Sequence, residues 1–448
     1  MTAQRINHLL LVAFMIAGSH RPSLGAEDSG TFTVGAAGVD ITPPPGLPLW
    51  GYAARHDSMA TGTLDPLLAR AVVLEANGRK LAIVATDLGR GPTPSMMASI
   101  RAESRERAGI TDVLVSGSHT HHGPVLELID RPGRGGGQAK FAPAIAYARS
   151  LPDRLVGVIV AADRARKPAR IGVHTRDVER NRNRQSRHDP KPIDHSLVVV
   201  RIEEDDLEAR PIALLVNYAA HPTLVPSKSM LYSADYPGAV RSRIEFERGA
   251  PCLFFQGAAG DLAALPEDGA RDHRAFGESL ALEALDANRS IRATRPAAPE
   301  LNFITERFRF GTRIDLKNPL VVAAYGRAFF PELVNSMADE FGGGADPELS
   351  VALIGRDLAI VAGSGEFFCE HANRFRSRTP GLTTLFLGYC NGHHMYFPTI
   401  EAAAEGGYGT EPGTSLAQLG AGERMMDRAL ILRHRLAGRF EAERLSPP

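Results

Sequence analysis

The stretch DVLVSGSHTHHGP, residues 112–124, joins a short apolar run to three closely spaced histidines. Val113, Leu114 and Val115 follow one another with no polar side chain between them, as in a strand that is buried on both faces. Three small residues end the run, and His119 is the first strongly polar side chain after them. This order predicts a buried strand whose carboxyl end presents imidazoles.

The same order of an apolar run, small residues and then a polar side chain occurs at five other places in the chain. The runs are LAIVAT (81–86), PIALLVNYAA (211–220), PCLFFQGAAG (251–260), LAIVAGSG (358–365) and TLFLGYC (384–390), followed by Asp87, His221, Asp261, Glu366 and Asn391. In open α/β sheets, ligands bind outside the carboxyl ends of the strands. Because six runs end in this way, we expect their polar side chains to converge on one site.

Longer amphipathic stretches lie between the apolar runs and predict helices over residues 94–108, 142–166, 271–288, 320–340 and 416–436. Near-continuous apolar strands that alternate with helices are typical of an α/β protein. We therefore expect a mixed, largely buried sheet covered by helices, with a metal site at the carboxyl ends of its strands.

The balance of charges argues against a nucleic-acid partner. Lys and Arg total 51, and Asp and Glu also total 51, so there is no basic excess to neutralise phosphates. An ordinary globular composition, 44% hydrophobic and 23% charged, agrees with a folded enzyme or binding protein.

The first 26 residues have the pattern of a secretory signal peptide. Arg5 precedes the apolar run LLLVAFMIAG, residues 9–18, and the segment PSLGA, which ends at Ala26, offers small residues for cleavage. Ten apolar residues are too few for a membrane-spanning helix, which needs roughly 20. We expect export to the periplasm or the exterior, with residues 27–448 forming a single domain. Export permits a disulfide, but Cys252, Cys369 and Cys390 are an odd number, and three buried thiols are the simpler interpretation.

The histidine cluster fits a metal site. On strand geometry His119 and His121 share a face, with Cα atoms roughly 6–7 Å apart, whereas His122 points the other way. His221 and Glu366 are the natural further ligands, and two imidazoles plus a carboxylate with an open position form a catalytic zinc set. The alternative for each histidine taken singly is an ordinary hydrogen bond at a strand end.

Several motifs together resemble the neutral/alkaline non-lysosomal ceramidase family. They are GVDITPPPGLPLWGY (38–52), SGSHTHHGP (116–124), NYAAHPT (217–223), QGAAGD (256–261), GSGEF (363–367) and a late segment containing tyrosine, in the order of that family. The resemblance runs from about Gly35 to Tyr408. It implies a zinc amidase with an α/β catalytic domain. Longer members add a C-terminal β-sandwich, which we expect this chain to lack.

The resemblance also implies roles for individual residues. One Zn²⁺ per chain would be bound by His119, His221, Glu366 and Tyr396. His121 would handle protons beside the metal, Gly51 would line the site, and Tyr408 would be a catalytic and substrate-binding residue. An active-site arginine follows an Asn-Arg pattern, which leaves Arg182 and Arg184, and we prefer Arg182. Asp87, Asp235 and Asp261 are either partners of the ligand histidines or helix caps.

Two positions depart from the family pattern. Ala263 takes the place of a serine, and His393 takes the place of a tyrosine. A water activated by zinc does not need that serine, so we interpret Ala263 as a changed substrate contact. His122, His393 and His394 receive no role.

The predicted function is zinc-dependent hydrolysis of an amide, or N-acyl, bond in a small or lipid-like substrate, with peripheral membrane contact as a further option. A smaller amide or ester, and a non-catalytic secreted binding protein that keeps the fold, are the alternatives. A serine hydrolase is disfavoured because no G-x-S-x-G motif occurs. The segment AAYGRAFFPELVNSM, residues 323–337, is interpreted as a core helix or, alternatively, as a wall of a lipid-facing groove.

Overall fold

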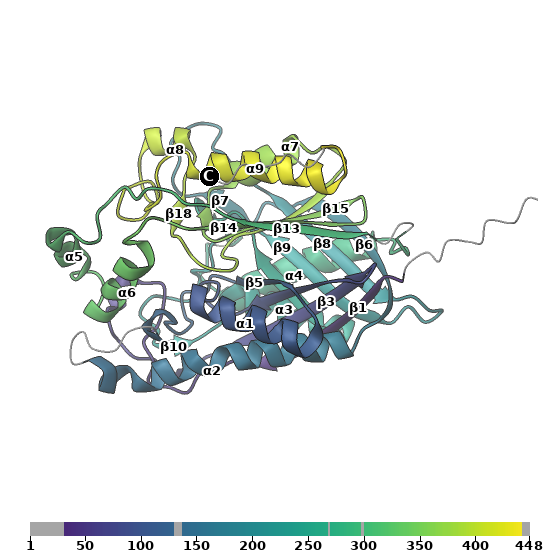
Figure 1. Ribbon diagram of the computed structural model, residues 1–448, viewed down its shortest axis with the longest axis horizontal. Coiled ribbons are helices and arrows are strands. Elements are labelled where there is room, and N and C mark those ends of the chain that lie inside the picture. The colour runs from purple at the N-terminus through teal and green to yellow at the C-terminus, as the bar shows by residue number, and fades with distance from the viewer. Residues whose placement is uncertain (1–30, 130–136, 268, 297–299, 441–448) are drawn as a thin grey trace, which may run out of the picture.

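The computed structural model describes residues 31–129, 137–267, 269–296 and 300–440 (Figure 1). The signal peptide predicted for residues 1–26 therefore lies outside the described residues. Among the described residues, no helix combines the length and the apolar character needed to cross a membrane.

A large mixed sheet of eight strands forms the centre of the molecule. Its strands, in spatial order, are β11 (Cys252–Gln256), β9 (Pro211–Tyr218), β8 (Ser196–Glu204), β6 (Lys167–Asp177), β1 (Thr33–Asp40), β3 (Leu68–Ala76), β4 (Arg79–Thr86) and β5 (Asp112–Gly117). The pairs at the two edges, β11 with β9 and β4 with β5, are parallel, and the other pairs are antiparallel. The sheet curls so that β11 at one edge lies close to β4 and β5 at the other.

A second sheet of four strands packs on the inner face of the first. It consists of β13 (Leu301–Arg307), β14 (Glu348–Ile354), β15 (Leu358–Gly363) and β17 (Thr383–Leu387). One core cluster joins the sheets, with Val72 and Ile83 from the large sheet and Ile360 and Leu385 from the small one. The next residue along each strand points to the opposite face and is buried there as well. Burial on both faces explains why the strands read as continuous apolar runs.

Helices cover the two outer faces, which gives four layers (Figure 1). On the large sheet, α1 (Pro94–Ala108) and α2 (Gly137–Arg164) lie over the half formed by β1, β3, β4 and β5. The helices α3 (Asp235–Arg248) and α4 (His273–Arg289) lie over β8 and β11 in the other half. On the small sheet, α7 (Cys369–Ser377) and α9 (Ala421–Leu436) cover β14 and β17. The predicted mixed α/β fold is confirmed, and the second sheet is an additional feature.

The predicted helices differ from the observed ones in instructive ways. The helix expected over 94–108 has those bounds, because Thr93 accepts a hydrogen bond from the amide of Met96 and Gly109 ends it in the left-handed conformation. The single helix expected over 320–340 is instead two, α5 (Pro319–Tyr325) and α6 (Pro331–Phe341). Pro331 cannot donate a helical hydrogen bond and forces the residue before it to be extended.

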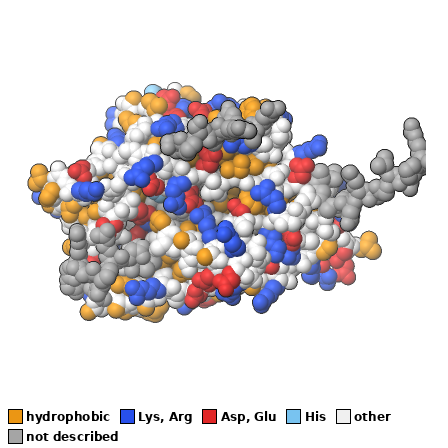
Figure 2. Space-filling view, in the orientation of Figure 1, with side chains coloured by type: hydrophobic (Ala, Val, Ile, Leu, Met, Phe, Trp, Pro, Cys, Tyr) orange, Lys and Arg blue, Asp and Glu red, His pale blue; other side chains and the backbone are white. Residues whose placement is uncertain are grey.

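Short strand pairs and loops complete the fold near the ends of the sheet. They are β2 (Gly62–Thr63) with β10 (Leu231–Tyr232), β7 (Asn181–Asn183) with β12 (Leu262–Ala264), and β16 (Glu366–Phe367) with β18 (Tyr396–Phe397), together with α8 (Ile400–Glu405). Cys252, Cys369 and Cys390 are all buried free thiols. On the face seen in Figure 2, acidic and basic side chains are interspersed, and hydrophobic side chains gather at the end where α5 lies.

Candidate metal centre

Three histidines from two distant segments meet beyond the ends of β5 and β9. The curl of the large sheet brings β5 close to β11, the neighbour of β9, so His119 and His121 after β5 face His221 after β9. The distances between their Nε2 atoms are 2.9 Å for His119–His221, 3.2 Å for His121–His221 and 3.4 Å for His119–His121. Nitrogens bound tetrahedrally to one zinc at about 2.0–2.1 Å would be roughly 3.3 Å apart. The three imidazoles therefore have the spacing of a metal site.

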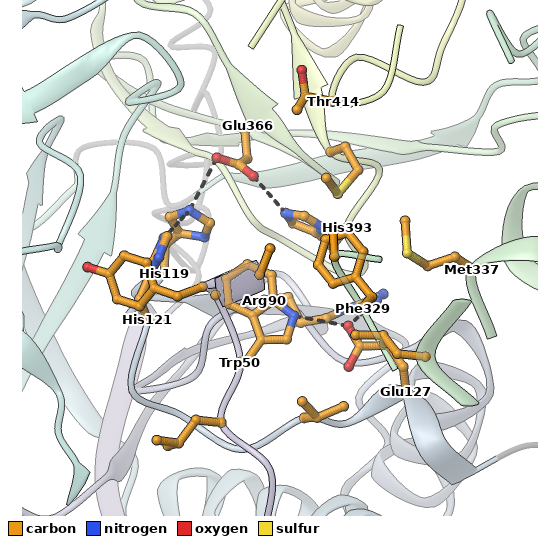
Figure 3. Close-up of a pocket in the computed structure, with 18 of the residues that line it drawn as sticks. Trp50, Arg90, His119, His121, Glu127, Phe329, Met337, Glu366, His393 and Thr414 are labelled. Atoms are coloured by element: carbon orange, nitrogen blue, oxygen red, sulfur yellow. Dashed lines mark hydrogen bonds and ion pairs between the residues drawn. The ribbon is translucent and has the colours of Figure 1, made fainter. Parts of the chain in front are cut away.

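Glu366 supplies a carboxylate to the same point (Figure 3). Its Oε2 lies 3.2 Å from Nε2 of His119 and 3.8 Å from Nε2 of His221. Oε2 is buried and accepts no hydrogen bond, a costly state for a carboxylate oxygen. A cation between the carboxylate and the imidazoles would satisfy this oxygen, so the residues present fit a metal ion.

Main-chain carbonyls fix the tautomers of two of the histidines. Nδ1 of His119 lies 2.8 Å from the carbonyl oxygen of Gly89, and Nδ1 of His221 lies 3.1 Å from that of Ala259. Each Nδ1–H donates to its carbonyl, which leaves the lone pair of Nε2 facing the centre. His121 differs, because its Nδ1 is buried and has no hydrogen-bond partner.

The protonation states suit a metal site as well. Burial lowers the pKa of His121 and of His221 well below its usual value, with His119 adding to the effect for His121 and Arg184 for His221. Burial alone would raise the pKa of Glu366, but the contact with His119 outweighs it and the pKa lies well below its usual value. Neutral imidazoles and an ionised carboxylate are the forms that bind metals.

As predicted, His119 and His121 point to one side and His122 points to the other, but strand geometry is not the cause. The strand ends at Gly117, and His119 has a positive φ of 66°, so a turn rather than a strand aims His119 and His121 at one point. His122 points away, where its ring nitrogens lie 2.9 and 3.1 Å from Nη2 of Arg55.

Of the two candidate arginines, Arg184 lies at the cluster, and not Arg182, which we preferred. Nη2 of Arg184 donates to the carbonyl of Gly260 at 2.8 Å and to the hydroxyl of Tyr396 at 3.2 Å, and lies 3.1 Å from Nδ1 of His221. Arg182 is exposed, because alternate residues of β7 point to opposite sides. The structure therefore brings Arg184, and not Arg182, to the cluster.

The two predicted tyrosines lie together beside Arg184. The guanidinium of Arg184 is 5.2 Å from the ring centre of Tyr408, and the rings of Tyr396 and Tyr408 meet edge to face at 5.6 Å. Tyr396 is buried, whereas Tyr408 is 55% exposed. The hydroxyl of Tyr396 has Arg184 as its hydrogen-bond partner, so this structure does not place it among the converging donor atoms.

The three aspartates considered as partners of the ligand histidines do not contact them. Asp87 accepts a main-chain amide and pairs with Arg241, and Asp235 accepts the main-chain amides of Val225 and Tyr236. Asp261 accepts the amide of Cys369, the first residue of α7, at 2.7 Å. These carboxylates hold turns and helix ends, and carbonyls orient the histidines in their place.

A cavity of about 580 Å³ opens onto the cluster. Gly51, His119, His121, Glu366, Tyr396 and Tyr408 line it, as does a large apolar wall made of Leu49, Val125, Phe329, Phe330, Leu333, Met337 and Phe341. Residues 329–337 thus form part of the cavity wall, in agreement with the groove alternative. Ala263 is absent from the lining, and its main chain instead pairs with Arg182 and His221.

Several residues of the site had no role in the sequence analysis. The ring of Trp50 meets His119, His121 and His393 edge to face at 5.2–5.7 Å, and its Nε1 donates to Glu127 at 3.0 Å (Figure 3). Arg90 is buried and forms ion pairs of 3.0 Å with Glu127 and with Glu340. Trp50 belongs to the motif WGY and Arg90 follows the end of β4, and these positions were the only signals in the sequence.

Replacing Gly51 with alanine is expected to disturb the cluster. Gly51 has a φ of 104°, and a Cβ placed on it would lie 2.6 Å from Cγ and 2.7 Å from Cα of His121. Because the clash involves the main chain of His121, the turn that carries His121 must shift. We therefore expect the free energy of unfolding to fall by about 1–3 kcal/mol and metal binding to weaken.

Thermal unfolding and zinc titration of Gly51→Ala measure both effects. Gly46→Ala is the matched control, because Gly46 has a similar φ of 91° but open space around its Cβ position. Equal behaviour of the two variants would show that the contact with His121 does not matter.

Comparison with known proteins agrees with the geometry at the level of the fold. Neither a family model nor a curated protein sequence matches the chain. The fold is similar to that of the neutral ceramidase from Pseudomonas aeruginosa, with a TM-score of 0.70 and 21% sequence identity over 94% of this chain and 77% of that chain. The fold is also similar to that of a ceramidase complexed with C2, with a TM-score of 0.71 and 19% identity over the same shares of the two chains. The chain therefore has the neutral ceramidase fold, which confirms the predicted resemblance at that level.

Proposed function

We propose that this protein is an exported, zinc-dependent amidase that hydrolyses an N-acyl bond of a lipid-like substrate. The observation that carries the proposal is the convergence of three imidazoles and a buried carboxylate oxygen that accepts no hydrogen bond, beside an apolar-walled cavity. The shared fold with neutral ceramidases supports the reaction class. The sequence pattern of residues 1–26 supports export, and residues 27–448 would form the single catalytic domain.

His119, His221 and Glu366 would hold the metal ion, one per chain. The two histidines have tautomers fixed by main-chain carbonyls, and Oε2 of Glu366 accepts no hydrogen bond, so these three residues are the best-prepared donors. Two imidazoles and a carboxylate suit zinc, and the resemblance adds Tyr396 as a further ligand. When bound, zinc polarises the acyl carbonyl and lowers the pKa of a water to about 7.

His121 is the imidazole best suited to move a proton. Its Nε2 faces the centre, and no partner on Nδ1 fixes its tautomer, unlike His119 and His221. His121 would take a proton from the attacking water at Nε2 and release it to the departing amine, so that a C–O bond forms and the C–N bond of the amide breaks.

Arg184 and Tyr408 would stabilise the oxyanion that forms when the carbonyl is attacked. Both line the cavity, and the guanidinium lies close to the tyrosine ring and to the hydroxyl of Tyr396. Donors that are fixed in place before the reaction stabilise such a charge without rearrangement.

The cavity favours an acyl chain over a small polar amide. Its apolar wall comes largely from α6 and the residues just before it, and the pairs of Arg90 with Glu127 and Glu340 hold α6 against the body of the molecule. Ala263 lies outside this lining, so the missing serine removes no side chain from the cavity. This position therefore gives little support to a non-catalytic binding protein.

Peripheral contact with a membrane is part of the proposal. The helix α5 carries no charge, none of its residues is buried, and Leu320 is 81% exposed. Tyr325 in α5 donates to the carbonyl of Gly413, which lines the cavity, so this apolar helix lies beside the cavity wall. A lipid substrate could then enter from the membrane surface.

A panel of substrates tests the proposed function. Zinc-loaded protein is assayed on a long-chain N-acyl sphingosine, a short-chain N-acyl amide and the corresponding esters. We expect hydrolysis of the amides, with the long chain preferred, and loss of activity with a chelator. Zinc-loaded protein that turns over none of these substrates would favour the binding protein, and inhibition by a fluorophosphonate but not by a chelator would favour a serine hydrolase.

A further inference from the structure

His393 lies against the outer oxygen of the metal-binding carboxylate. Its Nε2 is 3.2 Å from Oε1 of Glu366, and its side chain is 4% exposed (Figure 3). A carboxylate only accepts, so Nε2 carries the proton and donates it. Glu366 thus uses one oxygen for His393 and leaves Oε2 for the cluster of imidazoles.

Neighbouring rings fix the orientation of His393. The ring of Trp50 meets it edge to face at 5.3 Å, and the ring of Tyr389 lies nearly parallel to it at 6.4 Å. Main-chain hydrogen bonds hold the segment of His393 beside the segment of Glu366. The amide of Glu366 donates to the carbonyl of Met395 at 2.9 Å, and the amide of His394 donates to the carbonyl of Ser364 at 2.9 Å. The donor therefore reaches Glu366 from a rigid frame.

We infer that His393 is a positioning residue that presents Oε2 of Glu366 to the metal. The last torsion of a glutamate is broad, so an unheld carboxylate would rotate away from the three nitrogens in a part of the molecules. One charge-assisted hydrogen bond to Oε1 removes that freedom. The inference rests on the metal site of the proposed function and adds a residue to which the sequence analysis gave no role.

Zinc affinity of two variants of similar size tests this inference. In His393→Gln, an amide N–H can replace the donor, whereas His393→Leu fills the space without a donor. Competition with a chromophoric chelator should show zinc affinity reduced about tenfold to a hundredfold in the Leu variant. The Gln variant should retain affinity within a few-fold of the wild type.

Two further measurements separate positioning from other roles. Thermal unfolding of the metal-free variants shows whether they fold, and His393→Asn, whose amide is too short to reach, serves as a second donor-free variant. The visible spectrum of the cobalt-loaded Leu variant should match that of the wild type at saturation, because no ligand has been removed.

The possible results distinguish the role of His393 from the proposed zinc site itself. Equal zinc affinity in the Leu, Asn and wild-type proteins would overturn the inference, as would equal losses in Leu and Gln. A second bound metal that disappears in the Leu variant, or a changed cobalt spectrum, would make His393 a ligand and overturn it too. Absence of zinc binding by the wild type would overturn the proposed function itself.

Discussion

Glu366→Gln is expected to abolish hydrolysis and to weaken zinc binding by more than about a hundredfold. The glutamine keeps the size of the side chain but removes the negative charge whose Oε2 lies 3.2 Å from His119. Several kcal/mol of transition-state stabilisation depend on the metal, which corresponds to a loss of roughly 10³-fold or more in kcat/KM. Metal analysis of the dialysed protein and the rate on an N-acyl amide measure both quantities.

His56→Ala is the control for this variant. His56 is exposed and lines the same cavity, but it lies outside the cluster and pairs with Asp57. Its zinc content and kcat/KM should stay close to those of the wild type. If Glu366→Gln kept full zinc content and activity, Glu366 would have no role as a ligand.

Arg184→Ala is expected to lower kcat by about 10²–10³-fold while zinc stays bound. The guanidinium lies beside both tyrosines of the cavity and would stabilise the oxyanion, whereas none of the converging donor atoms belongs to it. Because the loss falls mainly on the transition state, KM should change much less than kcat.

Arg182→Ala is the matched control for Arg184→Ala. It removes an arginine two residues away that is exposed and outside the cavity lining. Its kcat should remain within a few-fold of the wild type. A large loss in Arg182→Ala with little change in Arg184→Ala would show that the structure assigns the wrong arginine.

The sequence predicted the class of fold better than its layers. Runs such as LAIVAT revealed strands buried on both faces, and capping by Thr93 and Gly109 made the bounds of α1 predictable. A strand that is covered by a second sheet reads the same as one covered by helices, since both bury alternate residues equally. For that reason the core cluster that Ile83 and Ile360 share was not visible in the sequence.

Some residues of the candidate site could be predicted from the sequence, and others could not. His119, His221 and Glu366 could be predicted because each follows an apolar strand, and the carboxyl ends of strands collect ligands. Arg90 and Glu340 could not be paired, since 250 positions separate them and no local pattern links them. Likewise, strand alternation would put Arg182 and Arg184 on the same side, and only the end of β7 at Asn183 lets Arg184 turn toward the cluster, which no pattern in the charged sequence around them indicates.

Stepwise addition of zinc to the metal-free full chain tests the central claim most directly, with hydrolysis of a long-chain N-acyl amide measured at each step. We expect no hydrolysis without zinc, a linear rise with bound zinc, and a plateau at one zinc per chain. A metal-free chain that hydrolyses the amide at the full rate would contradict the account, and so would a chain that binds one zinc and remains inactive on every amide and ester offered.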